Sequence, residues 1–593
     1  MTQNNNKSIG RFNVGKRLGE GMQGMVFLGW DPSLERNVAL KVVTQTDGNN
    51  EQSQAVINEA KIAAKLSHPN LIPIYEVGMY ESFPLLVFEY VDGITLSQYL
   101  KEKGALNEED ALTIMIDIVK GLKCAHDEDI MHLDLSPKNI MIDQEGRARI
   151  MDFGLARVTV TGDNKNIAGT PKYMSPEHFS HKKLTLATDI FSLGLIFYEM
   201  LTGSRAIPHK ELDTIIDHIA MAIIDWEKLH TLNISPQMIA TIRDMVQREP
   251  GKRYQSASDL LSNLNDIIEI QRNEEKGLLS LEFLLRRLNR SPEFPACSTS
   301  IAEINRLTEE SSNTDFNKLT AVIARDYSLT NRILKISNSV IFDRGSGGVK
   351  TISQAISRLG LKLVRMISNG LLLFKQAENK DSDLKDIVTA SFVAGLIARH
   401  ITLSIKRSIA EEAFICALFH NLGTHLLVFY LPDEYEDIKA LVENGEEQQK
   451  AERKILSTTT ASLGKAVAKK WNFPEALINC MERLPLDKKE PINNNEDILR
   501  HAANFANELC LLVMSNKSND HLHVQIESFI EKYQTVFSGD ATSLALLTTA
   551  AAEKFSDLAP GLGISYANSN FCNHLANFAE RMNISPSTEL LAS

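Results

Sequence analysis

The chain has 593 residues, of which 43% are hydrophobic and 23% are charged, and its formal net charge at pH 7 is −12. This length is too great for one hydrophobic core and predicts two to four domains. The negative charge argues against a nucleic acid or an anionic membrane as a partner recognised through bulk charge. The six cysteines lie far apart and form no C-x-x-C pair, which favours reduced thiols in a cytoplasm over disulfides or a zinc site.

The chain starts with the polar segment MTQNNNKSIG, which lacks the apolar core of a signal peptide. Its two most apolar stretches are DIFSLGLIFYEML and FICALFHNLGTHLLVFYL. Both are interrupted by polar groups or flanked by charge short of the ~20 apolar residues that a membrane span needs. We therefore expect two buried core helices and a soluble, cytoplasmic protein without a membrane contact.

Three kinds of sequence pattern, called textures below, follow one another along the chain. The first mixes short β-rich runs with one helix, the second has mostly helices, and the third has only amphipathic helical patterns. The charged segment IEIQRNEEKGLLS separates the second texture from the third. The expected units are a flexible start at 1–10, a first domain at 11–268, a linker at 269–277, a helical domain at 278–515 and a helical extension at 516–593. In the first domain we expect strands at 12–18, 25–30, 37–43 and 85–91, and a helix at about 53–66.

A glycine-rich loop follows the first expected strand. The segment LGEGMQGMV places Gly19, Gly21 and Gly24 at G-x-G-x-x-G spacing, with Val26 just after them. Glycine allows backbone N–H groups to approach phosphate oxygens closely. A dinucleotide-binding turn has the same spacing but opens a helix, whereas a strand continues here. The loop therefore predicts a nucleotide phosphate site of another kind.

Two charged residues after this loop each have a second interpretation. Lys41 ends the apolar run VALK, and Glu59 lies in the helical stretch AVINEAKIAAKL. Lys41 fits an edge lysine with its ammonium in solvent, and Glu59 fits a solvated helix carboxylate. The alternative is a lysine that contacts the α- and β-phosphates of a nucleotide and is held by a carboxylate from a helix.

Oxygen ligands are concentrated in two short segments. MHLDLSPKNIMID contains Asp134 and Asn139, and the later DFG begins at Asp152. Asn139 and Asp152 are residue types that hold Mg²⁺ or Mn²⁺ against the β- and γ-phosphates of ATP. Asp134 is the residue type that accepts the proton of a substrate hydroxyl.

Together these motifs, in this order, resemble the eukaryotic-like protein kinase family over residues 12 to about 268. GTPKYMSPE resembles the segment that receives the protein substrate, and it fits the serine/threonine branch better than the tyrosine branch. The resemblance implies a two-lobed α+β kinase fold, with a small lobe at about 11–91 and a large lobe at about 92–268. It also implies transfer of the γ-phosphate of ATP, with Mg²⁺ or Mn²⁺, to Ser or Thr of a protein.

Three further segments carry roles by the same resemblance. TDIFSLGLIFYEMLTG resembles a buried helix that anchors the large lobe through Asp189, and REPGKRYQS carries Arg253, which would pair with Glu177. FEYVDG resembles the hinge between the lobes, where Glu89 and Val91 would offer backbone groups to adenine.

The catalytic-loop segment departs from the family pattern H-R-D-L-K-P-x-N at two positions. Leu133 replaces the Arg that neutralises a phosphorylated activation loop, so control through that pair is in doubt. Ser136 replaces the Lys beside the γ-phosphate, but Lys138 directly precedes Asn139. We hypothesise that Lys138 takes the place of the missing cation; the alternative is a solvated loop lysine.

Three threonines lie between the metal-binding Asp152 and Glu177. Thr159 and Thr161 are candidate phosphorylation sites, although an exposed loop threonine need not have any such role. By resemblance, Thr170 is expected to bond Asp134 and to shape the acceptor site.

The third texture resembles the HDOD domain, an all-helical bacterial relative of the HD phosphohydrolases. The matching segments include IARDYSLTNRILKISNS, TISQAISRLGLKLVRMIS and AEEAFICALFHNLGTHLL. The parent fold binds divalent metal through His residues and a His-Asp pair. Here the pair position is His420-Asn421 and the upstream His position falls on Ala390; an amide brings no charge to offset a cation. His425 lies five residues after His420, off the same helix face, so we interpret His420 as a core or helix-end histidine.

Three functional hypotheses remain at this point. The first is a bacterial serine/threonine kinase in signal transduction whose helical domain senses a ligand or recruits partners, with a homodimer left open. The second is a pseudokinase that binds ATP as a conformational switch. The third and weakest makes the helical half a metal phosphohydrolase. The segment at 516–593 carries no assignable motif and would extend the helical domain or mediate association.

Overall fold

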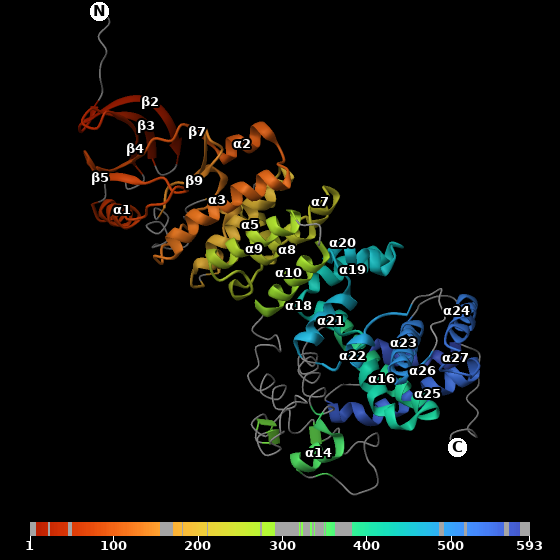
Figure 1. Cartoon of the computed structure of the whole chain (residues 1–593). Coiled ribbons are helices and arrows are strands. Elements are labelled where there is room, and N and C mark those ends of the chain that lie inside the picture. Colours follow the sequence, from red (N-terminus) through yellow and green to blue (C-terminus); the bar gives the residue numbers. More distant parts are fainter. Residues whose placement is uncertain are drawn as a thin grey trace, which may run out of the picture. The chain divides into compact units, whose positions relative to one another are not determined.

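The computed structural model describes residues 8–21, 24–44, 50–153, 170–180, 182–209, 211–272, 276–290, 319–320, 322–323, 333–334, 337, 349, 351–361, 364, 382–471, 473–484, 492–514, 519–562 and 569–581. The chain divides into two compact units, at 1–276 and at 277–593 (Figure 1).

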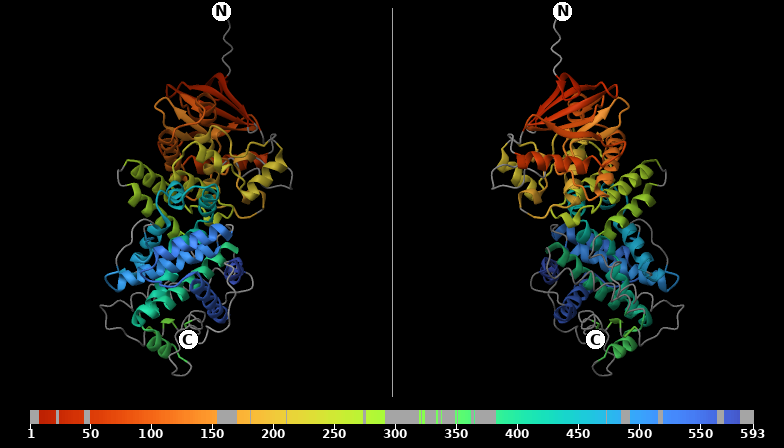
Figure 2. Two further views of the ribbon diagram at one scale, coloured as in Figure 1. Left: turned by 90° about the vertical axis from the view of Figure 1, so that its right-hand side faces the viewer. Right: turned by 90° about the vertical axis from the view of Figure 1, so that its left-hand side faces the viewer.

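The first unit opens with a six-stranded antiparallel sheet, whose twist Figure 2 shows from two sides. Along the sheet the strands are β1 (Ser8–Ile9), β2 (Phe12–Gly21), β3 (Gly24–Asp31), β4 (Arg36–Val43), β6 (Phe83–Glu89) and β5 (Ile74–Tyr80). Side chains alternate between the two faces of a strand, and β4 shows this directly. Val38, Leu40 and Val42 pack into a core with Phe12, whereas Val43 packs with Leu86 and Phe88 on the face that carries helix α1 (Asn50–Ala63).

Helices and a small second sheet make up the rest of this unit. The sheet consists of β7 (Gly93–Thr95), β8 (Ile140–Asp143) and β9 (Ala148–Ile150). The expected core helix is α5 (Leu186–Thr202), which is buried over most of its length because its sequence is apolar on almost every face. The other helices are α2 (Leu96–Lys103), α3 (Glu108–His126), α4 (Pro176–Phe179), α6 (Leu212–Met221), α7 (Trp226–Thr231), α8 (Pro236–Met245) and α9 (Ala257–Arg272).

The second unit contains only helices among its described secondary-structure elements. They are α10 (Lys276–Arg290), α14 (Ile352–Leu359), α16 (Ser382–Ile405), α17 (Ala410–Phe419), α18 (Leu422–Tyr430), α19 (Pro432–Glu443), α20 (Gln448–Leu456), α21 (Thr460–Lys470), α22 (Glu475–Asn479), α23 (Asn495–Met514), α24 (Asn519–Lys532), α25 (Ala541–Leu562), α26 (Asn570–Ala576) and α27 (Phe578–Arg581). One hydrophobic core runs from Leu284 to Phe578, so the segment after residue 515 packs into the same core as the helices before it.

Two boundaries expected from the sequence need correction. The expected linker at 269–277 is largely helical, because α9 continues to Arg272 and α10 begins at Lys276. The buried Ile267 and Ile270 show why: the apolar stripe of α9 continues past residue 268. The expected division at 515/516 does not separate two packed bodies, because α24 and α25 contribute to the core of the second unit.

Two segments of the second unit are long and apolar enough to cross a membrane, by length and composition alone. They are Lys385–Ile405 and Arg407–Tyr430, and 67% and 78% of their most apolar windows are buried inside the structure. The second contains a stretch that we expected to be too short for a span. Because both pack largely against other helices, they resemble core helices equally well.

Candidate active site

The glycine-rich loop lies at the turn between β2 and β3. Gly21 pairs with Gly24, and Val26 pairs with Lys41 on the neighbouring strand β4. Gly24 has a φ of +149°, and a Cβ added there would lie 2.0 Å from Val42 O. Only glycine fits this close approach without moving β4. The strand register therefore brings the glycine-rich turn beside Lys41.

Lys41 is buried and its ammonium meets Asp152. The Nζ of Lys41 lies 2.8 Å from Asp152 Oδ2, and the two side chains are 6% and 13% exposed. Lys41 lies on the sheet face that carries α1, since it alternates with Leu40 and Val42 along β4. This burial rules out the edge-lysine interpretation. Glu59 lies in α1 on that side, and its pairing with Lys41 stays a prediction.

A second cluster joins Asp134 to Asn139 and Thr170. The Nδ2 of Asn139 donates to Asp134 O at 2.8 Å and to Asp134 Oδ2 at 3.1 Å. The backbone N–H of Thr170 donates to Asp134 Oδ1 at 3.1 Å. The expected contact between Thr170 and Asp134 is thus made through the backbone.

The hairpin of β8 and β9 brings the two clusters together. Ile140 pairs with Ile150, and the N–H of Met151 donates to Asn139 O at 3.0 Å. Asn139 and Asp152 therefore flank the same hairpin end. Because Asn139 uses its amide nitrogen on Asp134, its side-chain oxygen is the atom left to face a cation. That oxygen and the Asp152 carboxylate form a hard donor pair that suits Mg²⁺ or Mn²⁺. Within the described residues, no group of three His, Cys, Asp or Glu side chains forms a metal site elsewhere.

Asp189, on α5, holds the backbone before Asp134. Its carboxylate accepts the N–H of His132 at 2.8 Å and of Leu133 at 2.7 Å, and lies 3.0 Å from His126 Nε2. Burial by itself raises the pKa of Asp189, but its bonds to His126 and His132 outweigh burial and leave the pKa below its ordinary value. Leu133 has a φ of +65°, which costs a non-glycine residue about 1 kcal/mol or more. Asp189 stabilises this strained turn.

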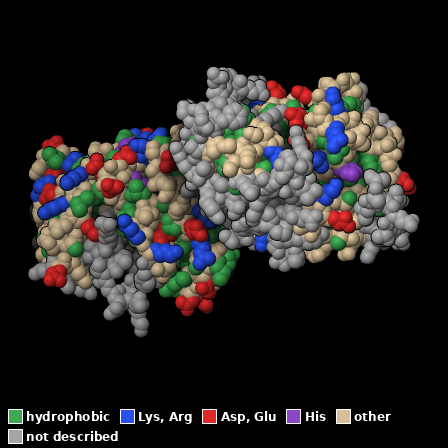
Figure 3. Space-filling view, turned by 90° about the horizontal axis from the view of Figure 1, so that it is seen from below, with side chains coloured by type: hydrophobic (Ala, Val, Ile, Leu, Met, Phe, Trp, Pro, Cys, Tyr) green, Lys and Arg blue, Asp and Glu red, His purple; other side chains and the backbone are tan. Residues whose placement is uncertain are grey.

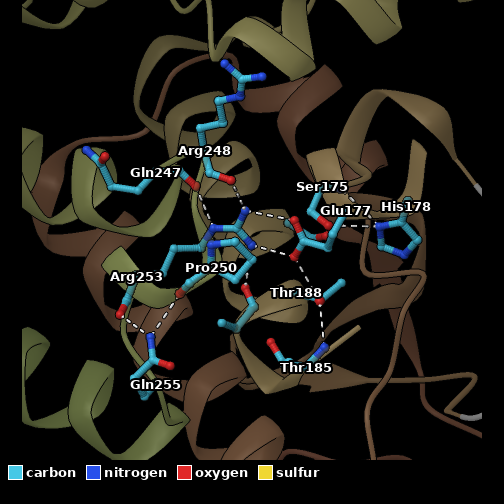
Figure 4. A network of polar contacts seen from close by, with 12 residues as sticks. Ser175, Glu177, His178, Thr185, Thr188, Gln247, Arg248, Pro250, Arg253 and Gln255 are labelled. Atoms are coloured by element: carbon cyan, nitrogen blue, oxygen red, sulfur yellow. Dashed lines mark hydrogen bonds and ion pairs between the residues drawn. The ribbon is translucent and has the colours of Figure 1, made fainter. Parts of the chain in front are cut away.

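Glu177 and Arg253 form a fully buried ion pair in the large lobe (Figure 4). Arg253 donates to both Glu177 oxygens, at 2.6 and 2.9 Å, and Thr188 donates to Oε1 at 2.9 Å. Burial alone raises the pKa of Glu177, but the bond and charge of Arg253 lower it below its ordinary value. This pair fixes the segment that follows Thr170 against α5.

In the second unit, the side chains of His420 and Asn421 are both engaged in hydrogen bonds with other parts of the domain. His420 Nδ1 lies 2.5 Å from Cys480 O, and Asn421 Nδ2 donates to Asn507 Oδ1 at 2.9 Å. Burial lowers the pKa of His420 to about 4 and that of His425 to about 4, so both rings are neutral at pH 7. The helix is interrupted at this point: His420 is the C-cap residue of α17, and His425 lies in the next helix, α18. The arrangement fits buried core histidines.

Comparison with known proteins agrees with the geometry of the first unit. Residues 12–264 match the model of the protein kinase domain. This part of the chain is a protein kinase domain. Residues 294–484 match the model of the HDOD domain, so the second unit carries an HDOD domain extended by the helices after it.

Several bacterial kinases are similar to a part of this chain that is about as long as the kinase domain. A probable serine/threonine-protein kinase of Clostridium perfringens is 32% identical over 265 residues, which are 43% of this chain and 38% of the relative. Serine/threonine-protein kinase PrkC of Bacillus subtilis is 32% identical over 276 residues, 45% of this chain and 42% of the relative. Serine/threonine-protein kinase PknB of Mycolicibacterium smegmatis is 30% identical over 281 residues, which are 46% of this chain and 45% of the relative. The chain thus spans less than half the length of these relatives.

The two departures in the catalytic loop of the kinase domain have different surroundings. Ser136 is 1% exposed, and its Oγ has no hydrogen-bond partner within the described part of the chain. Lys138 is exposed in the short turn Pro137–Asn139. A serine at 136 therefore fits a space closed to water, while the lysine two residues later remains able to reach a ligand. That role of Lys138 stays a prediction.

The hinge of the kinase domain contains a contact that the sequence did not suggest. The Glu89 carboxylate binds Arg149 on β9 with two hydrogen bonds of 2.7 and 2.9 Å. The N–H of Glu89 donates to Pro73 O at 3.1 Å. An adenine contact from Glu89 therefore requires its carbonyl, and Val91 stays a predicted partner. Gly154, Thr159 and Thr161 lie outside the described residues.

Proposed function

We propose that the chain is an ATP-dependent serine/threonine protein kinase of bacterial signal transduction. The observation that carries this proposal is the convergence of four side chains at one hairpin end. Lys41 bonds Asp152, Asn139 bonds Asp134, and the β8–β9 pairing brings the two pairs together. This arrangement provides a cation for phosphates, oxygen donors for a metal ion and a carboxylate for a hydroxyl proton.

Each residue has one task in phosphoryl transfer. Lys41 contacts the α- and β-phosphates of ATP beneath the glycine-rich turn, and Asn139 and Asp152 would hold Mg²⁺, which offsets the phosphate charge. Asp134 accepts the proton of the Ser or Thr hydroxyl while the oxygen of that hydroxyl bonds to the γ-phosphorus of ATP. The bond between the γ-phosphorus and the bridging oxygen breaks, and ADP leaves. In the structure Asp134 Oδ1 and Oδ2 are already oriented by Thr170 and Asn139. Lys138 supplies the cation that Ser136 lacks.

Regulation follows from Leu133 and from the HDOD domain. Because the Leu133 side chain is buried and uncharged, activation does not pass through an arginine–phosphate pair at this position. The HDOD domain then provides binding or regulation rather than hydrolysis, since His420 and Asn421 are bonded to Cys480 and Asn507. We place the protein in the cytoplasm. On the face shown in Figure 3, basic and acidic side chains are interspersed among the coloured residues, which suits protein partners better than nucleic acid.

The test is phosphotransfer from labelled ATP with Mg²⁺ to casein and to the protein itself. We expect label with the wild-type chain and with Glu145→Gln, an exposed carboxylate near the loop, and a loss of at least 100-fold with Asp134→Asn or Lys41→Met. Lys138→Ala is expected to fall between these groups. Equal activity in Lys138→Ala and wild type would exclude its assigned role. Label on no acceptor, with ATP still bound, would favour the pseudokinase switch.

A further inference from the structure

The HDOD domain contains a polar cavity of about 400 Å³. It is lined by the end of α20, the turn into α21, the first turns of α21 and the residues Glu482 and Arg483 after α22. The largest apolar side chain on the lining is that of Ala461. A cavity of this size can hold a small molecule, and its lining selects a polar one.

The walls of the cavity are held by close packing and hydrogen bonds. A Cβ on Gly423 would lie 1.8 Å from Thr460 O, so α18 and the start of α21 cross in backbone contact. Next to Glu482, the buried Asn504 donates to Glu482 O at 3.0 Å and accepts from the N–H of Leu484 at 2.9 Å. Thr460 and Glu482, both on the lining, are therefore held by the core of the domain.

The two carboxylates on the lining are already satisfied. Glu452 is buried and accepts from the N–H of Thr460 at 3.0 Å, from its hydroxyl at 2.9 Å and from Gln448 at 2.8 Å. Glu482 pairs with Lys465 at 2.7 Å. Lys465 thus offsets the charge of Glu482, whereas Glu452 keeps its charge and has only neutral donors; within the described residues neither carboxylate forms an ion pair with Arg453 or Arg483.

Two arginines and two hydroxyls remain for a ligand. Within the described part of the chain, the Arg453 guanidinium donates one hydrogen bond, to Gln449 Oε1 at 3.4 Å, and the Arg483 guanidinium forms no ion pair or hydrogen bond. The hydroxyls of Ser457 and Thr458 likewise form no hydrogen bond there, whereas Thr459 caps α21. Guanidinium groups bind the oxygens of phosphate or carboxylate in a planar, two-bond geometry.

We propose that this cavity binds a small hydroxylated phosphate ester. Arg453 and Arg483 take the phosphate oxygens, and Ser457 and Thr458 bond the hydroxyl groups of the ester. The lining has no aromatic side chain on which a nucleobase would stack, which separates this ligand from ATP. The site lies in the second unit and is independent of the proposed phosphotransfer, so either proposal can fail without the other.

Isothermal titration calorimetry of the full chain tests the site, with glycerol 3-phosphate as the probe and with inorganic phosphate and glycerol as comparisons. We expect the ester to bind more tightly than phosphate and glycerol not to bind. Arg453→Gln with Arg483→Gln should weaken the ester at least 10-fold. Lys469→Gln, which removes an exposed cation from the last turn of α21, should leave binding unchanged.

Three results would overturn the site: no binding of the ester, equal affinity for ester and phosphate, or equal affinity in the double variant and the wild type. The Lys41→Met variant locates any other heat signal, because binding lost there and kept in the double arginine variant belongs to the kinase domain. A thermal melt of each variant shows that it is folded. If the double variant has a lower melting temperature than the wild type, Arg453→Lys provides the second comparison. This change keeps the charge but loses the two-bond geometry, so it should weaken the binding of the ester several-fold.

Discussion

Replacing Arg253 by Met should destabilise the kinase domain strongly. The change removes two hydrogen bonds to Glu177 and three to the carbonyls of Ala187, Gln247 and Arg248. It leaves the Glu177 carboxylate in a site that is almost closed to water, with Thr188 as its remaining side-chain donor. Removing one partner of a buried pair costs about 3–5 kcal/mol, and we expect a loss in this range.

The structure also gives a matched control and a double-mutant cycle. Arg205 is 48% exposed and lies 3.9 Å from Glu199, so Arg205→Met should cost less than about 1 kcal/mol. Glu177→Gln removes the charge but keeps an acceptor for Thr188. Combined with Arg253→Met, it should cost less than the sum of the two single changes, with a coupling of about 2 kcal/mol.

Unfolding in urea can be followed for the kinase domain alone. Of the three tryptophans, Trp30 and Trp226 lie in the first unit and Trp471 in the second. A Trp471→Phe background therefore reports only the first unit. The pKa of Glu177 is lowered in the fold, so its contribution is present above its ordinary pKa and is lost as pH falls through the lowered value. A loss below 1 kcal/mol for Arg253→Met at pH 7, or no coupling in the cycle, would refute this account.

Three further predictions concern the HDOD unit. The pKa of His420 and of His425 is about 4 in the fold, so the free energy of unfolding should fall as the pH drops from 6.5 to 4, by about 2 kcal/mol for each ring at pH 5. Urea unfolding, followed by the fluorescence of the buried tryptophan of this unit, measures this fall. A free energy of unfolding that does not change with pH would contradict the prediction. Asn421→Asp places a carboxylate against Asn507 Oδ1, so we expect a loss of about 1–3 kcal/mol and no gain of bound metal by elemental analysis. Asp386→Ala removes the acceptor of two buried hydrogen bonds from the start of α26. Compared with the wild type, this variant should show faster hydrogen exchange in α26 and a smaller change in α16. Unchanged exchange in α26 would argue that packing alone holds this segment.

Local chemistry made several features readable in the sequence. Glycine spacing predicted the turn between β2 and β3, because close approach to β4 at Gly24 admits no side chain. Period-two runs predicted β2, β3, β4 and β6, although β5 was missed because its partly exposed strand mixes Glu, Gly and Met with apolar residues. The order of the motifs predicted the kinase fold, and the paired Glu177 and Arg253 lie where the family resemblance put them.

Tertiary structure decided how distant residues meet. Three contacts join residues that lie far apart in the chain. Lys41 bonds Asp152, Arg149 bonds Glu89, and residues after 515 complete the core of the HDOD unit. Helical periodicity is a property of a short window and carries no information on which apolar faces meet. The polar cavity likewise combines residues from α20, from α21 and from the segment after α22, which a short sequence window cannot bring together. The sequence by itself determined which chemical groups this protein has, and packing decided which of them stand together.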